Sequence, residues 1–160
     1  MKLTAERLRE LLHYDPETGV FVWVVRSNQN TPTGATAGTT GQPYIVISIA
    51  GRLYGAHRLA WLYVHGVWPA RHIDHRDGNG NNNRIANLRD VPRTVNMQNR
   101  RKAQANNQSG LQGAMKNGNS WMSRIAVNGV PKYLGTFPTP ELAHQAYLEA
   151  KRKLHEGCTI

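Results

Sequence analysis

Residues 72–100 read HIDHRDGNGNNNRIANLRDVPRTVNMQNR. The Asn- and Gly-rich segment 77–83 is typical of a loop, and the apolar residues on either side of it predict short strands at residues 71–76 and 88–91. A helix is expected to begin at Thr94 and to run to about residue 103. The stretch therefore predicts a strand-loop-strand-helix unit of about thirty residues.

Three polar side chains of this unit offer groups that suit phosphodiester hydrolysis, a reaction that needs an activated water and stabilisation of the leaving 3′ oxygen. His75 can take a proton from water near neutral pH, because an imidazole has an ordinary pKa of about 6.5. The carboxylate of Asp74 and the amide oxygen of Asn96 are hard donors that favour Mg²⁺ or Mn²⁺. Asn99 shares a helix face with Asn96 and is a rival for the same role.

The unit resembles the HNH family of nucleases, the ββα-metal class found in phage and intron-encoded homing endonucleases. The resemblance covers residues 71–101 and lies in an Asp-His pair, an Asn-rich loop, an Asn-Leu at the second strand and a further Asn in the helix. It implies that His75 is the general base and that Asp74 and Asn96 hold one divalent metal, Mg²⁺ or Mn²⁺. It gives Asn87 a supporting catalytic role, in which its side chain bridges the loop and fixes the strand carrying His75. Many relatives have histidine where this chain has Asn96, so a zinc site is less expected.

The charge of the chain points to a polyanionic partner. The formal net charge is +10, and residues 52–102 alone carry ten Lys and Arg against three Asp and Glu. Clustered cations displace the counterions of a phosphate backbone, so a nucleic acid is the expected partner, and the resemblance to HNH nucleases implies double-stranded DNA. The basic residues around the predicted helix are the candidates for phosphate contacts: Arg93, Arg100, Arg101 and Lys102.

The C-terminal part predicts a three-stranded antiparallel sheet packed on one helix. Strands are expected at residues 111–116, 121–127 and 132–137, with Asn-Gly turns between them, and a helix at residues 140–154 with Thr139 as its cap. Alternation along the middle strand places Trp121 and Ile125 on one face and Arg124 on the other. The first face is expected to pack on a helix stripe formed by Leu142, Ala143, Ala146, Tyr147, Ala150 and Leu154.

This part resembles the Apetala or ethylene-response-factor type of DNA-binding domain. The resemblance lies in Ser109, Gly110, Gly113, Trp121, Ile125, the motif YLGTF at residues 133–137 and the Ala-rich helix. That family lays its sheet in the DNA major groove, which implies a set of DNA-facing candidates: Gln112, Lys116, Arg124 and Lys132. Ala114 and Met115 depart from the family's usual residues, so no base preference is transferred.

Residues 1–69 predict a further α+β region. We expect a helix at residues 4–13, a strand at 20–25, a loop at 28–41, a hairpin formed by 44–49 and 52–56, and a helix at 57–65 that ends at Gly66. The motifs HRLAW and HGVWP resemble the N-terminal portion of the same phage nucleases, which suggests a role in positioning DNA. His57 and His65 are interpreted as structural, and a packing or surface role is favoured for His72.

The expected fold class is therefore α+β, with four segments along the chain. These are the N-terminal region (1–69), the nuclease unit (70–103), a linker (104–109) and the DNA-binding domain (110–160). The single cysteine, Cys158, excludes an internal disulfide and a Cys-rich zinc finger. No signal peptide and no membrane-spanning stretch is recognisable, so a cytoplasmic protein is expected, in the host cell if a phage encodes it.

Two classes of function follow from these patterns. The first is an endonuclease that nicks or cuts double-stranded DNA, as a monomer or a homodimer and without a small-molecule cofactor. The second is a non-catalytic DNA-binding protein in which the nuclease unit is a relic; retention of Asp74, His75, Asn87 and Asn96 argues against it. An RNA-directed nuclease is less favoured, because no aromatic-rich platform for single strands is evident.

Overall fold

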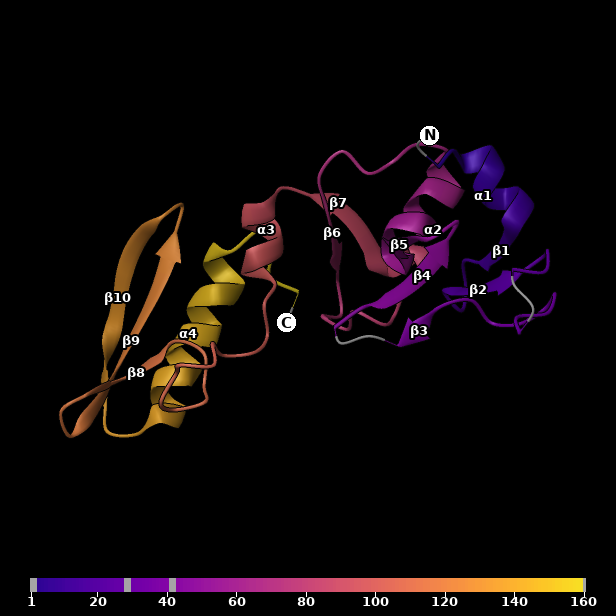
Figure 1. Cartoon of the computed structure of the whole chain (residues 1–160). Helices are drawn as coiled ribbons and strands as arrows, with labels where there is room; N and C mark the ends of the chain where they lie inside the picture. The colour runs from indigo at the N-terminus through magenta and orange to yellow at the C-terminus, as the bar shows by residue number, and fades with distance from the viewer. Residues whose placement is uncertain (1–2, 28–29, 41–42, 160) are drawn as a thin grey trace. The chain divides into compact units, whose positions relative to one another are not determined.

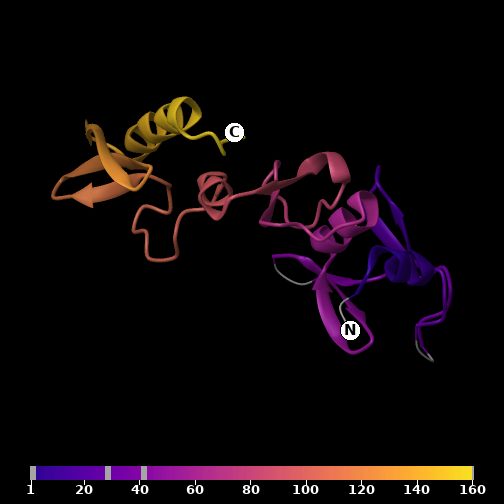
Figure 2. The ribbon, with the colours of Figure 1, turned by 90° about the horizontal axis from the view of Figure 1, so that it is seen from above.

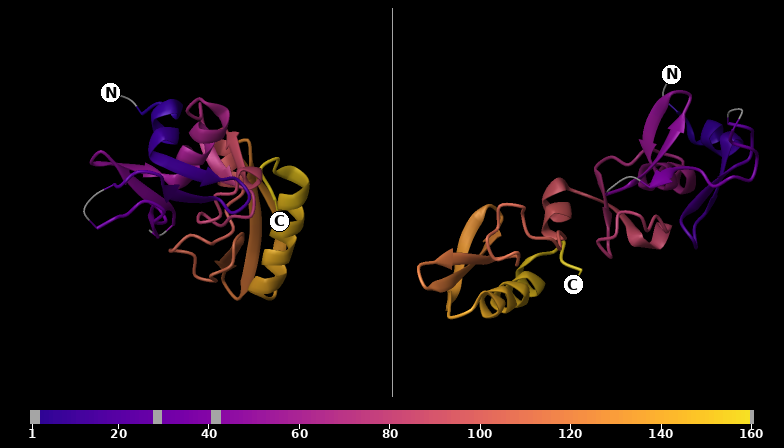
Figure 3. Two further views of the ribbon diagram at one scale, coloured as in Figure 1. Left: turned by 90° about the vertical axis from the view of Figure 1, so that its right-hand side faces the viewer. Right: turned by 60° about the horizontal axis from the view of Figure 1, so that its bottom comes forward.

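The structure, a computed structural model, describes residues 3–27, 30–40 and 43–159. It divides into two compact units, Met1–Arg93 and Thr94–Ile160, which are described one at a time below. Figure 1 labels their helices and strands, and Figures 2 and 3 show the same ribbon from other sides. The α+β class expected from the sequence is confirmed, since small antiparallel sheets and helices occur in both units.

The first unit begins with helix α1 (Ala5–Leu11), and the Thr4 hydroxyl accepts a hydrogen bond from the Arg7 N–H. The chain then forms a hairpin of β1 (Leu12–Asp15) and β2 (Val20–Trp23). The helix predicted to reach residue 13 therefore ends two residues early, and β1 was not predicted. Leu12 and Tyr14 are buried and His13 is exposed, a period of two that suits a strand.

A second sheet has the strand order β3-β4-β5, with β3 at Thr39–Thr40, β4 at Ile45–Ile49 and β5 at Arg52–Gly55. The predicted β4–β5 hairpin is confirmed, and both turn residues have positive φ, 49° at Ala50 and 75° at Gly51. The strand β3 was not predicted. Helix α2 (Ala56–His65) follows directly and ends at the left-handed Gly66, as expected. Its Leu59 and Leu62 are fully buried in the core of this unit.

The predicted pair of strands around the Asn-rich loop is present as β6 (His72–His75) and β7 (Leu88–Val91). They are antiparallel, with Asp74 opposite Arg89 and His75 opposite Leu88. A short 3₁₀ helix, η1 (Ile85–Asn87), closes the loop before β7. Ile73 and Leu88 join the hydrophobic core, which anchors the strand pair to α2 and the other elements of the unit.

Helix α3 (Arg93–Gln98) lies at the boundary of the units, and all but its first residue belong to the second one. The sequence predicted a helix to about residue 103, and this end is wrong. The carbonyls of Arg100 and Lys102 accept hydrogen bonds from the Gln112 side-chain amide, at 3.0 and 2.9 Å. The N–H groups of Asn99 and Arg100 bond to carbonyls three residues back, so the α-helical pattern of bonds four residues back ends with α3.

The rest of the second unit is a sheet of order β10-β9-β8 with helix α4 packed on it. Its elements are β8 (Ala114–Asn117), β9 (Ser120–Val127), β10 (Val130–Phe137) and α4 (Pro140–Leu154), and Figure 3 shows α4 beside the sheet. The strand predicted from residue 111 begins only at Ala114, because Gly113 has φ 76° and a Cβ there would lie 2.1 Å from the Tyr147 ring.

The helix stripe predicted for α4 is partly wrong. Ala143 is fully buried, but Leu142 and Leu154 are 44% and 38% exposed. The other buried residue of α4 is Lys151, which is 1% exposed and was not part of the predicted stripe. In β9 the expected alternation holds, with Ile125 buried and Arg124 exposed. Within the described residues, no helix is long and apolar enough to cross a membrane.

Candidate active site

Strand β6 carries the two central side chains of the candidate site, and both are only 5% exposed. Neighbours in a strand point to opposite faces of the sheet. Asp74 meets the guanidinium of Arg89, whereas the His75 ring meets the rings of Tyr44 and His57. The strand is therefore covered on both faces, and each side chain has a different environment.

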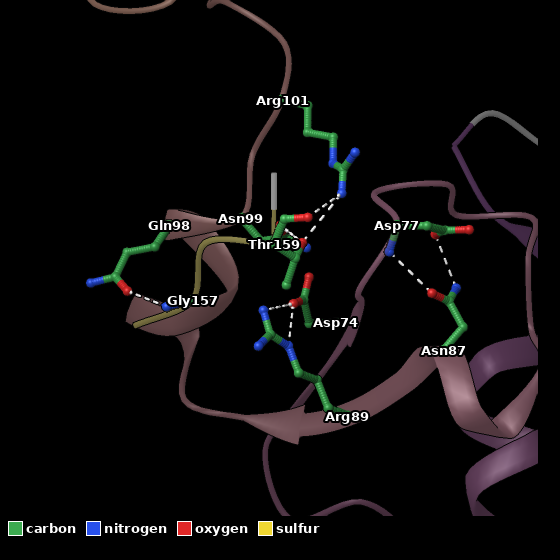
Figure 4. A network of polar contacts seen from close by, with 9 residues as sticks. All are labelled: Asp74, Asp77, Asn87, Arg89, Gln98, Asn99, Arg101, Gly157 and Thr159. Atoms are coloured by element: carbon green, nitrogen blue, oxygen red, sulfur yellow. Dashed lines mark hydrogen bonds and ion pairs between the residues drawn. The ribbon is translucent and has the colours of Figure 1, made fainter. Parts of the chain in front are cut away.

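Asp74 forms an ion pair with Arg89 across the strand pair (Figure 4). Its Oδ2 accepts from Arg89 Nε at 2.8 Å and lies 2.7 Å from Nη2. Residues that are directly opposite in an antiparallel pair are close enough for such contacts. Sequence reasoning missed Arg89, although the strand register that places it opposite Asp74 could have indicated it.

The His75 ring is held by Asn83 and by two aromatic neighbours. Its Nε2 lies 3.2 Å from Asn83 Oδ1. The Tyr44 ring stacks on it at a centroid distance of 5.8 Å, and the His57 ring meets it edge-on at 5.4 Å. An amide oxygen can only accept a hydrogen bond, so this contact selects the tautomer with its proton on Nε2. The lone pair then lies on Nδ1, the nitrogen that can abstract a proton.

Asn83 is the side chain that the sequence did not single out. The sequence predicted only a loop for the Asn-rich segment 77–83, but Asn83 in this segment is 1% exposed. Its backbone carbonyl also accepts a hydrogen bond from the Tyr14 hydroxyl at 2.6 Å. Burial of one asparagine in an otherwise exposed run follows from the tertiary contact with Tyr14, and nothing in the local sequence distinguishes it.

Burial lowers the pKa of His75, and this effect is opposed by the hydrogen bond that the ring donates to Asn83 and by the charges of Asp77 and Asp74, which raise the pKa. A lowered pKa keeps the imidazole neutral at pH 7. A neutral ring is the form that can act as a base, so the environment of His75 agrees with its expected chemistry.

Asn87 ties the ends of the loop together, as Figure 4 shows. Its Oδ1 accepts from the Asp77 N–H at 3.0 Å, and its Nδ2 donates to Asp77 Oδ1 at 3.0 Å and to the Asn82 carbonyl at 2.8 Å. Its own carbonyl accepts from the Arg76 N–H, directly after His75. This is the bridging arrangement that the resemblance implied; its effect on catalysis stays a prediction.

The second predicted metal ligand belongs to the other unit. Asn96 is half-buried on α3, and its pairing with Asp74 in a metal site therefore stays a prediction. Its rival Asn99 is 4% exposed, and the Oδ1 of Asn99 accepts a hydrogen bond from the Thr159 hydroxyl at 2.5 Å. That bond engages the ligand oxygen of Asn99, which favours Asn96.

The two predicted ligands, Asp74 and Asn96, carry oxygen donors of the kind that a hard divalent cation prefers. Among the residues that the structure describes, no group of three or more His, Cys, Asp and Glu side chains is placed to hold a metal ion. One carboxylate and one amide oxygen, completed by water and phosphate, are typical of Mg²⁺ or Mn²⁺. Zinc, which prefers nitrogen and sulfur, fits this set less well.

The predicted DNA-contact residues are mostly exposed. This holds for Arg93, Arg100, Arg101, Lys102, Lys116, Arg124 and Lys132. Gln112 differs, because its side chain is half-buried and bonded to the carbonyls of Arg100 and Lys102. A contact of Gln112 with DNA would require these bonds to break. The contacts of these residues with DNA stay predictions.

His57 is more than the structural residue expected from the sequence, since it contacts His75. Burial, together with the nearby His75 and Arg58, lowers the pKa of His57 to about 4. In the unfolded chain His57 takes up a proton near pH 6.5, whereas in the folded protein it does so only near pH 4. Acid therefore favours unfolding as the pH falls from about 6.5 to 4. At the lower end this group should reduce the free energy of unfolding by roughly 3 kcal/mol.

We therefore expect His57→Phe to flatten the acid side of the stability profile. Urea denaturation at pH 7, 6 and 5 measures it, and the wild type should lose more stability over this range than the variant. His65→Phe, an exposed histidine of the same helix, is the matched control and should follow the wild type. Parallel profiles for wild type and His57→Phe would contradict the expectation.

Comparisons with known proteins bear on the segment that contains this site. The comparisons with curated proteins and with solved structures returned no match. Residues 54–98 match the family model described as HNH endonuclease. The matched segment includes Asp74, His75, Asn87 and Asn96, and it supports a nuclease function for the unit built around β6 and β7.

Proposed function

We propose that the protein is a metal-dependent endonuclease that hydrolyses phosphodiester bonds in double-stranded DNA. The observation that carries this proposal is the state of His75. Its ring is buried, its Nε2 is paired with Asn83 and its pKa is lowered, inside the segment that matches the HNH endonuclease model. Activation of a water molecule requires a base that takes up its proton. A neutral imidazole with a selected tautomer, next to a carboxylate, can be that base.

His75 Nδ1 takes a proton from a water molecule as the water oxygen attacks the phosphorus. The bond from phosphorus to the 3′ oxygen breaks, and the products are a 5′ phosphate and, after the oxygen takes up a proton, a 3′ hydroxyl. A divalent ion held by Asp74 and Asn96, when bound, would neutralise the charge on the leaving oxygen. Arg89 orients the Asp74 carboxylate, and Asn87 holds the loop that follows His75.

The remaining parts of the chain would hold the DNA. In this proposal residues 110–160 form an Apetala-like domain whose sheet presents Lys116, Arg124 and Lys132, and residues 1–69 help to position the duplex. Arg93, Arg100, Arg101 and Lys102 would contact phosphates near the scissile bond. We also propose that residues 70–103 are the nuclease unit and residues 104–109 a linker. The enzyme would be of the phage or homing type.

Incubation of supercoiled plasmid with the protein and Mg²⁺ or Mn²⁺ tests the function. We expect nicked or linear products, and none when EDTA is present. Mapping the ends on both strands distinguishes a nickase from an enzyme that cuts both strands. Plasmid that stays supercoiled with either metal, although the protein binds it, would contradict the proposal and favour a non-catalytic DNA-binding protein.

A further inference from the structure

Helix α3 carries the proposed ligand Asn96, but it is short and poorly buried. It has six residues, and none of them is fully buried. Helices of this length are not stable on their own in water, so tertiary contacts must hold α3 in place. Within the second unit, the segment 157–159 bonds to the last residue of α3 and to the residue after it, and α4 bonds to Arg100, two residues beyond the helix.

The first contact joins Gln98, the last residue of α3, to Gly157. The Gly157 N–H donates to Gln98 Oε1 at 2.9 Å (Figure 4). Gly157 is buried, and a Cβ at this position would lie 2.1 Å from the Val95 carbonyl oxygen. The chain therefore passes so close to the backbone of α3 that only glycine fits.

The second contact lies two residues further along. The Thr159 hydroxyl donates to Asn99 Oδ1 at 2.5 Å, and Arg101 Nη2 donates to the Thr159 carbonyl and hydroxyl oxygens at 3.2 Å each. Asn99 is 4% exposed, and a hydrogen bond between buried groups is worth more than one in water. Thr159 thus bonds to two residues that follow α3, Asn99 directly after its end and Arg101 two residues further along.

The third contact is a buried lysine. Lys151 on α4 is 1% exposed, and its Nζ donates to the Arg100 carbonyl at 2.5 Å and to Gln112 Oε1 at 3.4 Å. Gln112 in turn donates to the Arg100 and Lys102 carbonyls. A buried ammonium group needs hydrogen-bond partners, and the Arg100 carbonyl and Gln112 supply them, so Lys151 ties α4 to the segment after α3.

We propose that the C-terminal segment 157–159 positions the α3 helix for metal binding, with Gln98, Asn99, Gly157 and Thr159 as positioning residues. The inference rests on the proposed function, because it takes Asn96 as a ligand. Residues that orient a ligand typically account for about 10- to 100-fold in metal affinity or activity. The segment follows the sheet and α4 directly, so the metal ligand and the proposed DNA-binding domain share one compact unit.

Thr159→Val tests this proposal, because it removes the hydroxyl and keeps the shape of the side chain. We expect it to raise the Mn²⁺ concentration for half-maximal plasmid cleavage by about tenfold. Hydrogen exchange of the α3 amides, measured without metal, should become faster. DNA affinity in EDTA should change by less than this factor, because Arg101, a proposed phosphate contact, keeps its bond to the Thr159 carbonyl. Thr159→Ser keeps the hydroxyl and should behave as the wild type, and Gly157→Ala should shift both readouts in the same direction as Thr159→Val.

The outcomes separate this inference from the proposed function. If the wild type cleaves and both Thr159→Val and Gly157→Ala keep its metal dependence, the C-terminal segment does not position the ligand and the inference is wrong. Unchanged hydrogen exchange in both variants overturns it as well. A wild type that does not cleave at any metal concentration overturns the proposed function and the inference with it.

Discussion

His75→Ala is expected to lower the rate of plasmid cleavage by about 10²- to 10⁴-fold, the usual contribution of a general base. The imidazole is the group beside Asp74 whose tautomer and lowered pKa suit proton abstraction. DNA affinity should remain, because the proposed phosphate contacts lie elsewhere. Single-turnover cleavage with saturating Mn²⁺ measures the rate, and a gel-shift titration in EDTA measures the affinity.

His72→Ala is the matched control for this variant. His72 begins the same strand and is exposed, so its loss should leave cleavage near the wild-type rate. Imidazole added to the His75→Ala protein should restore part of the activity, since the deleted ring leaves a space beside the rings of Tyr44 and His57. Cleavage by His75→Ala at the wild-type rate would show that another group activates the water.

Much of the fold was predictable where local patterns and tertiary contacts agree. The β6–β7 pair, the β4–β5 hairpin and α4 follow from apolar runs, turn residues and the Thr139 cap. Prediction failed where distant residues decide the local structure. Strand β1 exists because it pairs with β2, and the segment after α3, instead of continuing as a helix, is bonded through the Arg100 and Lys102 carbonyls to the distant Gln112.

The candidate site was predictable to a similar degree. Asp74 and His75 are marked by their spacing from the Asn-rich loop. Asn83, Arg89 and His57 contact these two residues from the loop, the opposite strand and α2, and they were missed. The sequence shows which side chains can act as a base or a ligand. The residues that determine the tautomer and pKa of His75 and the charge partner of Asp74 are brought to them by tertiary contacts.

Asp74→Ala is expected to abolish metal-dependent cleavage and also to destabilise the protein. The carboxylate is the proposed ligand, and it is also the ion-pair partner of Arg89, whose side chain is 16% exposed. Removal of one member of a largely buried ion pair costs about 3 kcal/mol, because the remaining charge loses its compensation. Urea denaturation measures the stability, and plasmid cleavage over a range of Mn²⁺ concentrations measures the activity.

The double variant Asp74→Ala/Arg89→Met separates the two roles. Replacing both charges removes the uncompensated guanidinium, so most of the lost stability should return, while cleavage should stay absent because no carboxylate remains. The single variant Arg89→Met is the control: it keeps the carboxylate and should retain metal-dependent cleavage at a reduced rate. If the double variant cleaves as well as Arg89→Met, Asp74 serves only as the partner of Arg89, and the metal must be held by other residues.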